Sequence, residues 1–280
     1  MPKGPQAPKE IIEFYEQYDE ADRLFRRKSV LEFARMQELL QRYLPPAPAV
    51  VLDVGGGPGA YATWLAKGGY EVHLVDATPK HIEQAMAASA QQPQHPIASM
   101  ALGDARRLLR AKGSADAVLL MGPLYHLVQR KDRFAALREA RRVTRPDGVV
   151  FAVGVHKFAS LFDGLVEGLI DDPEFAMLLD EDLRTGQHRN RVRHTEYFTT
   201  AKFHHWDELR SEVSDAGFNV IDTVSVQGPG WLAKDFQERW ADPKRREQLL
   251  SLVRAVEHDP SLAGVSQHFV VVGKKGRKTR

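Results

Sequence analysis

The chain has 280 residues, of which 43% are hydrophobic and 27% are charged, and its formal net charge is +2. This composition is typical of a globular protein with one large core, and the small net charge gives no argument for a polyanionic partner. The sequence contains no cysteine, which excludes disulfides, thiolate nucleophiles and thiolate metal sites. No stretch reaches the roughly 18 apolar residues of a membrane span, and the opening residues lack the apolar segment of a signal peptide. We therefore expect a cytoplasmic protein without a membrane partner, either a monomer or a homodimer.

Residues 10–44 have a helical pattern. Ser29-Val-Leu-Glu32 matches the capping box S-x-x-E, and apolar residues follow it at helical spacing. The prolines at 45, 46 and 48 then end the helix. We expect an N-terminal helical cap over residues 1–44.

The next hundred residues alternate between strand-like and helix-like segments. We expect strands at 49–54, 71–75, 97–102, 115–121 and 149–153, and helices at 60–67, after Thr78-Pro79, and at 131–143. Units of this length in this order predict an α/β fold with a doubly wound, mostly parallel sheet and right-handed crossovers.

The second half departs from this alternation. Residues 157–203 and 227–264 read as mostly helical insertions, with a helix at 206–216 and a strand at 218–226 between them. The last strand, 268–272, has no room for a crossover helix before the chain ends. We therefore expect the two final strands to be neighbours and one of them to be antiparallel.

A glycine-rich turn follows the first strand. Gly55, Gly57 and Gly59 allow positive φ angles and a close approach of a ligand to the backbone, and the next helix offers free N–H groups. The segment Gly55-x-Gly57-x-x-Ala60 also fits the dinucleotide fingerprint, which accepts alanine at its last position. The turn alone therefore predicts a nucleotide or nucleoside site without identifying the ligand.

Three acidic residues near strand ends narrow the choice. Asp53 precedes the turn, where a carboxylate suits a ligand with ammonium and sulfonium groups better than a pyrophosphate. Asp76 ends the second strand, where an acid accepts ribose hydroxyls, as in nicotinamide enzymes. Asp104 follows the third strand, where it is able to accept a hydrogen bond from an adenine amino group. A solvated strand end or a helix cap is the competing reading for each acid.

In the order of these motifs the sequence resembles the class I S-adenosylmethionine-dependent methyltransferases. The resemblance covers roughly residues 49–155 and rests on Val51-Leu-Asp-Val-Gly-Gly-Gly-Pro-Gly59, Asp76, Gly103-Asp-Ala105, Asp116-Ala-Val-Leu-Leu120 and Arg145-Pro-Asp-Gly148. It implies a seven-stranded sheet with a reversed last strand, S-adenosylmethionine as cofactor and S-adenosylhomocysteine as product. It also implies that the glycine turn lies beside the methionine part, Asp76 at the ribose and Asp104 at the adenine, with Ala105 and Met121 beside the donor.

On this reading the chain is one methyltransferase domain over residues 1–280, with a cofactor-binding core at 45–156 and substrate-side insertions at 157–203 and 227–264. At the front of the chain, Tyr15 and Tyr18 are candidates to close over the cofactor, and Arg23 is a candidate to bind its carboxylate. An exposed helix with an ordinary arginine is the competing reading.

Methyl transfer from a sulfonium requires alignment of donor and acceptor and, for a hydroxyl acceptor, removal of a proton. His126, in Met121-Gly-Pro-Leu-Tyr-His126, is a candidate base because an imidazole titrates near pH 6.5, and Tyr125 is a candidate pocket wall. This segment differs from the Asn/Asp-Pro-Pro-aromatic motif of enzymes that methylate base amines. Tyr197 and His204 are further catalytic candidates, in a segment that resembles the acceptor-facing part of small-molecule methyltransferases.

Other features of the second half have two readings each. Trp231 either contacts an aromatic substrate or fills the local core, and His205 with Trp206 either face the acceptor or begin the next helix. His188 and His194 are separated by arginines, and no histidines and acids share a metal-ligand spacing, so we expect no metal.

We therefore predict methyl transfer to an O or N nucleophile, or to C or S, of a small organic molecule. One alternative is an RNA-modifying methyltransferase that uses the basic tail at 273–280, although a short basic end is more often a solvated terminus. A second alternative is a protein that binds the cofactor without turnover, and a nicotinamide oxidoreductase is a more distant one.

Overall fold

The computed structural model describes residues 7–191 and 194–277. Its centre is a seven-stranded sheet in the order β3-β2-β1-β4-β5-β9-β8. Strand β9 is antiparallel to both of its neighbours, β5 and β8, and the other pairs in the sheet are parallel. This confirms the predicted sheet with its reversed last strand. The strands are β1 (Val50–Val54), β2 (Glu71–Asp76), β3 (Ser99–Leu102), β4 (Ala115–Leu120), β5 (Thr144–Val155), β8 (Asn219–Ser225) and β9 (His268–Lys274).

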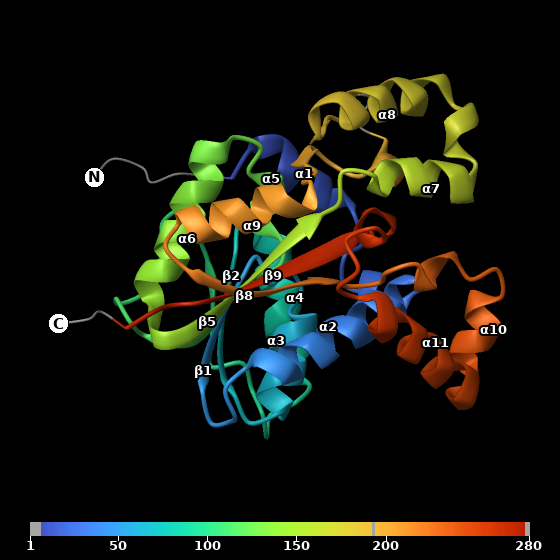
Figure 1. Cartoon of the computed structure of the whole chain (residues 1–280). Coiled ribbons are helices and arrows are strands. Elements are labelled where there is room, and N and C mark those ends of the chain that lie inside the picture. Colours follow the sequence, from blue (N-terminus) through green and yellow to red (C-terminus); the bar gives the residue numbers. More distant parts are fainter. Residues whose placement is uncertain (1–6, 192–193, 278–280) are drawn as a thin grey trace.

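Helices cover both faces of the sheet (Figure 1). Side chains alternate along a strand, so Val51 packs in one core cluster and its neighbour Leu52 in the other. The first cluster includes residues of α2 (Ser29–Tyr43), α3 (Ala60–Lys67) and α4 (Pro79–Ala90). The second includes residues of α5 (Pro123–His126), α6 (Arg130–Val143) and α9 (Trp206–Asp215). The sheet is therefore doubly wound, as predicted.

The N-terminal cap is not one helix. It consists of α1 (Lys9–Gln17), the short helix η1 (Arg23–Phe25) and α2. The predicted capping box is wrong: Ser29 is the first helical residue and makes no capping bond, and Glu32 binds Arg23 at 2.8 Å. The Lys80 side chain of α4 donates to the carbonyl of Glu16 at 2.9 Å and to that of Tyr18 at 3.1 Å. A cation is favourable at these carbonyls because the C-terminal end of a helix carries a partial negative charge. The contact holds α1 against α4.

Both insertions lie beyond the same end of the sheet (Figure 1). The first contains α7 (Ala159–Glu167), η2 (Leu169–Asp171), α8 (Pro173–Thr185), η3 (Thr195–Tyr197) and the short pair β6 (Gln187–His188) and β7 (Ala201–Lys202). The second contains η4 (Gly230–Leu232), α10 (Phe236–Ala241), α11 (Pro243–Val256) and η5 (Ala263–Val265). Trp231 is 1% exposed, and its indole N–H donates to the Val265 carbonyl at 2.9 Å. It therefore fills the local core, and the alternative reading as a substrate contact is wrong.

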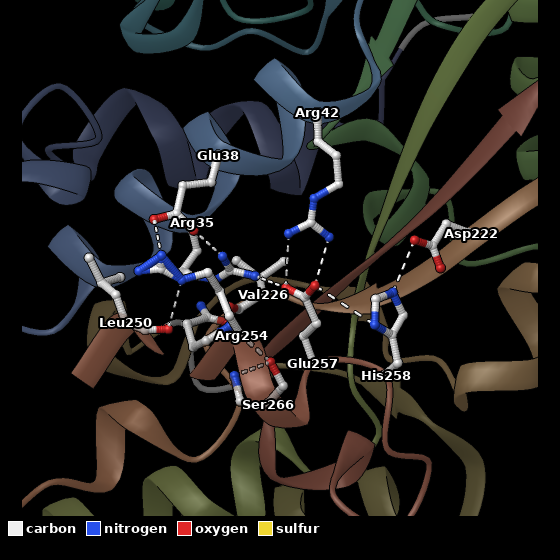
Figure 2. A network of polar contacts seen from close by, with 12 residues as sticks. Arg35, Glu38, Arg42, Asp222, Val226, Leu250, Arg254, Glu257, His258 and Ser266 are labelled. Atoms are coloured by element: carbon white, nitrogen blue, oxygen red, sulfur yellow. Dashed lines mark hydrogen bonds and ion pairs between the residues drawn. The ribbon is translucent and has the colours of Figure 1, made fainter. Parts of the chain in front are cut away.

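A buried polar network joins α2 to the second insertion (Figure 2). The Arg35 side chain is completely buried and pairs with Glu38 and with Glu257, which follows α11. Arg42 donates to the same Glu257 carboxylate at 2.6 Å. Loss of one partner from a buried ion pair leaves an uncompensated charge, which is costly. The cap and the second insertion are therefore coupled energetically.

The described residues contain neither a membrane-spanning helix nor a metal-binding group of side chains. No described helix is both long and apolar enough to cross a membrane. No group of three histidine, aspartate or glutamate side chains in that part of the chain could hold a metal ion.

Candidate functional site

The site begins with the turn between β1 and α3. Gly55, Gly57 and Gly59 have φ angles of 72°, 55° and 87°, which side chains rarely adopt. At Gly55 a Cβ would also lie 2.6 Å from Cδ of the Pro123 ring, which begins α5. Glycine is thus required there twice over, once by the backbone angle and once by the approach of α5.

Asp53 lies under this turn without a partner. Its side chain is completely buried, and neither carboxylate oxygen has a hydrogen bond in the described part of the molecule. Burial, with a smaller contribution from the Asp76 charge, raises the pKa of Asp53 to about 7. A buried carboxylate without a partner favours a positively charged ligand beside the turn.

Asp76, at the end of β2, is held in place by three donors. Its Oδ2 accepts from the Gly57 N–H at 2.9 Å, and its Oδ1 accepts from the Thr78 N–H at 2.8 Å and pairs with His81 Nδ1 at 3.1 Å. Burial alone would raise the pKa of Asp76, but the bonds to His81 and to these backbone groups lower it overall. Asp76 is therefore an ionised acceptor beside the turn.

Asp104 and its neighbours form the next part of the wall. Arg106 binds the Asp104 carboxylate with two side-chain nitrogens, at 2.9 and 2.8 Å. The carboxylate thus already has a bidentate partner, which the sequence reading did not foresee. Ala105 and Met121 line the same cavity as Asp104.

The three acids, with Gly55, Gly57, Ala105 and Met121, line one cavity of about 1090 Å³ that is partly open to solvent. Gly59 does not line it, and a Cβ there would face Ala85 of α4.

The N-terminal cap covers this cavity with Tyr15, Glu20 and Arg23. Arg23 was a candidate to bind the carboxylate of the cofactor, but its charge is already paired within the protein. Its Nε donates to Glu20 at 2.7 Å, and its Nη atoms donate to both Glu32 oxygens. Three of the five guanidinium N–H groups are thereby used within the protein.

His126 lies on the same cavity wall, at the end of α5. Its Nε2 lies 2.9 Å from the Tyr15 hydroxyl, and its Nδ1 lies 3.3 Å from the Thr200 carbonyl. Since a carbonyl only accepts, Nδ1 carries the proton and Nε2 accepts from Tyr15. Burial lowers the pKa of His126 to about 4, so the ring is neutral near pH 7. Its one basic nitrogen is covered by Tyr15.

A second cavity, of about 1700 Å³ including open solvent, adjoins the first. Tyr15, Glu20, Arg23 and Tyr125 line both cavities and therefore separate them. The second cavity is bounded by the cap, by α7 and by the segment around Tyr197 and Phe198. Two adjacent chambers with a common wall suit two ligands that react with each other.

Two of the predicted catalytic residues are not at the first cavity. His204 is completely buried beside the Arg133–Glu212 ion pair, its Nε2 lying 3.9 Å from Glu212, and it lines neither cavity. The prediction for His204 is wrong because backbone hydrogen bonds to Val155 and Lys157 hold it against the end of β5, where its side chain is in the core. Tyr197 lines only the second cavity, and its hydroxyl donates to Asp172 at 2.6 Å. This bond holds η3 against α8.

His205 is an N-cap of α9, and its side chain and that of Glu208 form a reciprocal capping box. The interpretation that His205 begins the next helix is therefore correct. His188 is turned away from a ligand role by Asp182 at 2.8 Å and by the Tyr197 carbonyl, which face its two ring nitrogens.

Sequence reasoning missed several residues of the site. His81 orients Asp76 from the first turn of α4, and Glu20 pairs with Arg23. The neighbouring Thr78-Pro79 helix start was a usable signal for His81. No local signal marked Asp163, which lies on α7 and lines the second cavity.

A doubly wound sheet with a reversed last strand, and a cavity at its glycine turn flanked by three acids, define the class of protein as a nucleoside-binding α/β domain. Residues 51–148 match the family model described as a methyltransferase domain. The chain belongs to the class I S-adenosylmethionine-dependent methyltransferases.

Individual relatives agree with this assignment. The chain is 30% identical over 191 residues to methyltransferase GfsG of Streptomyces halstedii, an alignment that covers 68% of this chain and 60% of that protein. It is 34% identical over 111 residues to the uncharacterized methyltransferase Rv3342 of Mycobacterium tuberculosis, covering 40% of this chain and 42% of that one. The chain thus spans less than two thirds of the length of either relative.

A solved structure of an S-adenosylmethionine-dependent methyltransferase from Methanosarcina mazei superposes with a TM-score of 0.57 at 17% identity. That superposition covers 86% of this chain and 98% of the other, and it shows a common fold.

The cofactor of this family fits the first cavity. The unpartnered Asp53 carboxylate would lie near the positive charges of S-adenosylmethionine. At Gly57 the place of a Cβ is open, with no atom of the described residues, apart from those next to it in the chain, nearer than 3.9 Å. Asp76 offers an ionised acceptor.

Proposed function

We propose that this protein transfers a methyl group from S-adenosylmethionine to an O or N nucleophile of a small organic molecule. The observation that carries the proposal is the pair of cavities with a common wall of Tyr15, Glu20, Arg23 and Tyr125. The first cavity would hold the donor and the second the acceptor. Transfer would then require the two ligands to be aligned across the boundary that these four residues form.

The donor supplies a methyl group activated by a positive sulfur. In the proposed site, the turn at Gly55, Gly57 and Gly59 lies against its methionine part, and Asp53 stabilises its positive charge. Asp76 accepts from the ribose hydroxyls. Asp104 is the proposed acceptor for the adenine amino group, with Arg106 fixing its orientation.

Ala105 and Met121 complete the donor wall, and Tyr15 with Arg23 closes it from the cap. These groups exclude water from the reacting atoms. A dry site strengthens the electrostatic interactions within it.

Proton removal is proposed to run through Tyr15. Tyr15 lines both chambers, and its hydroxyl donates to His126 Nε2 at 2.9 Å. As a hydroxyl acceptor is methylated, its proton passes to the Tyr15 oxygen while the Tyr15 proton passes to His126 Nε2. With S-adenosylmethionine bound, this proton transfer would leave His126 as an imidazolium, which would balance the positive charge that the donor gives up. His126 therefore acts through Tyr15, not by direct contact with the acceptor.

Partial cover of the second cavity supports a small acceptor over a polymer. The first insertion contributes α7 and the Tyr197 segment to its lining, and no described residue of the second insertion lines it. A polymer would need an open groove.

The contacts of the basic tail do not favour the RNA alternative. Lys275 donates to the carbonyl oxygens of Arg141 and Thr144, and Arg277 pairs with Asp147. These side chains are used to hold the end of β9 against β5. The last three residues of the predicted basic tail, 278–280, lie outside the described residues.

Two titrations and one turnover assay test the proposal. S-adenosylhomocysteine should bind in calorimetry and NAD should not; binding of NAD alone would refute the methyltransferase function. Incubation with donor carrying an isotopically labelled methyl group and fractionated metabolites should label a small molecule. Label found only in RNA would support the RNA alternative, and tight cofactor binding without any labelled product would support a non-catalytic binding protein.

A further inference from the structure

The second cavity has an unusually aromatic lining. Aromatic side chains reach it from the cap, from α5, from α8 and from the segment before α9: Phe14, Tyr15, Tyr18, Tyr125, Phe175, Tyr197, Phe198 and Phe203. Such a wall favours an apolar or aromatic body, and the faces of its rings attract cations. The shape of the chamber is thus suited to a hydrophobic ligand with a positive group.

The charged residues of the same cavity are mostly neutralised by one another. Glu20 and Glu32 both bind Arg23, and Glu167 lies 3.3 Å from Lys28. His188 faces Asp182 and a carbonyl, and burial lowers the pKa of His268. These groups leave little free charge for a ligand.

Two carboxylates of the lining lie outside these pairs: Glu196, which is exposed to solvent, and Asp163, which is partly buried. Asp163 projects from α7 on the same face as Ser160 and Glu167, which also line the cavity, as expected for residues three and four apart on a helix. Its Oδ1 accepts from the Gln267 amide at 2.7 Å. Within the described residues, no lysine, arginine or histidine lies within ion-pair distance of it.

Burial raises the pKa of Asp163 to about 6, although the bond from Gln267 lowers it. A carboxylate in this situation gains from a cation that enters the cavity. Arg27 also lines the cavity, but it is exposed, so solvent stabilises its charge without a protein or ligand partner.

We propose that the acceptor molecule has an apolar or aromatic body and a protonated amine, and that Asp163 binds the ammonium group while the aromatic wall binds the body. This inference rests on the proposed function, because it assigns the second cavity to the acceptor. It identifies Asp163 as the residue that determines specificity for charge. The ammonium is a recognition group and need not be the atom that is methylated.

Three indole probes of nearly equal size test this assignment: tryptamine, with an ammonium group; tryptophol, with a hydroxyl; and indole-3-propionate, with a carboxylate. Each is titrated calorimetrically into the full chain, with and without saturating S-adenosylhomocysteine. Tryptamine should bind at least 10-fold more tightly than tryptophol, since charge-assisted hydrogen bonds are about twice as strong as neutral ones. Indole-3-propionate should bind most weakly.

The variant Asp163→Asn keeps the acceptor oxygen for Gln267 and removes the charge. It should weaken tryptamine binding roughly 10- to 100-fold and leave tryptophol binding within about twofold. Asp171→Asn is the matched control, because it removes an exposed carboxylate from the same insertion that does not line the cavity. It should change neither affinity.

Equal affinities for tryptamine and tryptophol would overturn the inference. So would a tryptamine affinity that Asp163→Asn leaves unchanged, or the failure of all three probes to bind at millimolar concentration. The proposed function fails by a different result, the absence of S-adenosylhomocysteine binding. The titrations without that compound still report on Asp163 in that case.

Discussion

Gly55→Ala tests whether the turn is built for a close approach, and Gly113→Ala supplies the control. Both glycines have positive φ, 72° and 63°, so both variants should suffer the cost of about 1 to 2 kcal/mol for a left-handed alanine. Only Gly55 has a neighbour: its added Cβ would lie 2.6 Å from the Pro123 ring, whereas nothing lies within 4 Å of the corresponding Cβ at Gly113.

Forcing an extra methyl group into a packed site costs about 1 to 3 kcal/mol more. The expected loss of unfolding free energy is therefore about 2 to 5 kcal/mol for Gly55→Ala and about 1 to 2 kcal/mol for Gly113→Ala. Urea denaturation measures both losses. Calorimetry with S-adenosylhomocysteine should show weakened binding only for Gly55→Ala. Equal losses of stability, or an unchanged cofactor affinity in Gly55→Ala, would refute the role of the Pro123 contact.

Four further predictions follow from the contacts. Arg35→Met leaves Glu257 buried with a single arginine, and the free energy of unfolding in urea should fall by about 3 kcal/mol. The control Arg184→Met breaks an exposed ion pair and should lower the free energy of unfolding by less than about 0.5 kcal/mol. Equal losses in the two variants would contradict burial as the cause of the Arg35→Met effect. Affinity for S-adenosylmethionine should rise from roughly pH 6 to pH 8, because Asp53, with a pKa of about 7, loses its proton over this range. Calorimetry should show no pH dependence of the affinity for Asp53→Asn. A pH-independent affinity in the wild type would remove Asp53 from the site. Asp76→Ala should weaken S-adenosylhomocysteine binding by about 1 to 3 kcal/mol, and an unchanged dissociation constant would exclude a role at the ribose. Tyr15→Phe should slow labelled methyl transfer about 10- to 100-fold with S-adenosylhomocysteine affinity unchanged, and a normal rate would exclude the Tyr15–His126 route.

The sheet and its crossovers were predictable because each of those elements has a local signal. The apolar run at 49–54 breaks into glycines, and the helix Ala60–Lys67 has the bounds that the sequence predicts. Strand and helix alternation then leaves few topologies, since crossovers are right-handed. The reversed β9 was implied by the resemblance to the methyltransferase family. Chain length does not require it, because the insertion between β8 and β9, with α10 and α11, is long enough for a crossover.

The cap and the insertions were less predictable because long-range contacts decide their structure. Ser29 and Glu32 have the spacing of a capping box, but Glu32 accepts a hydrogen bond from Arg23 of the preceding helix η1 instead. Residues 18–28 were included in a helix that the structure interrupts. Trp231 and His204 looked chemically useful, but packing buries both. Composition gives no indication of which insertion residues will face a cavity.

The wall between the two chambers has a bearing on how this chain relates to others. Tyr15, Glu20 and Arg23 stand before residue 51, and Asp163 stands after residue 148, so all four fall outside the region that matches the family model. The glycine turn and its acids fall inside it. Tyr125 is the part of the wall that falls inside it. Two proteins can therefore share residues 51–148 closely and still differ in most of the residues that line the second chamber, so likeness within that region informs mainly about the donor site.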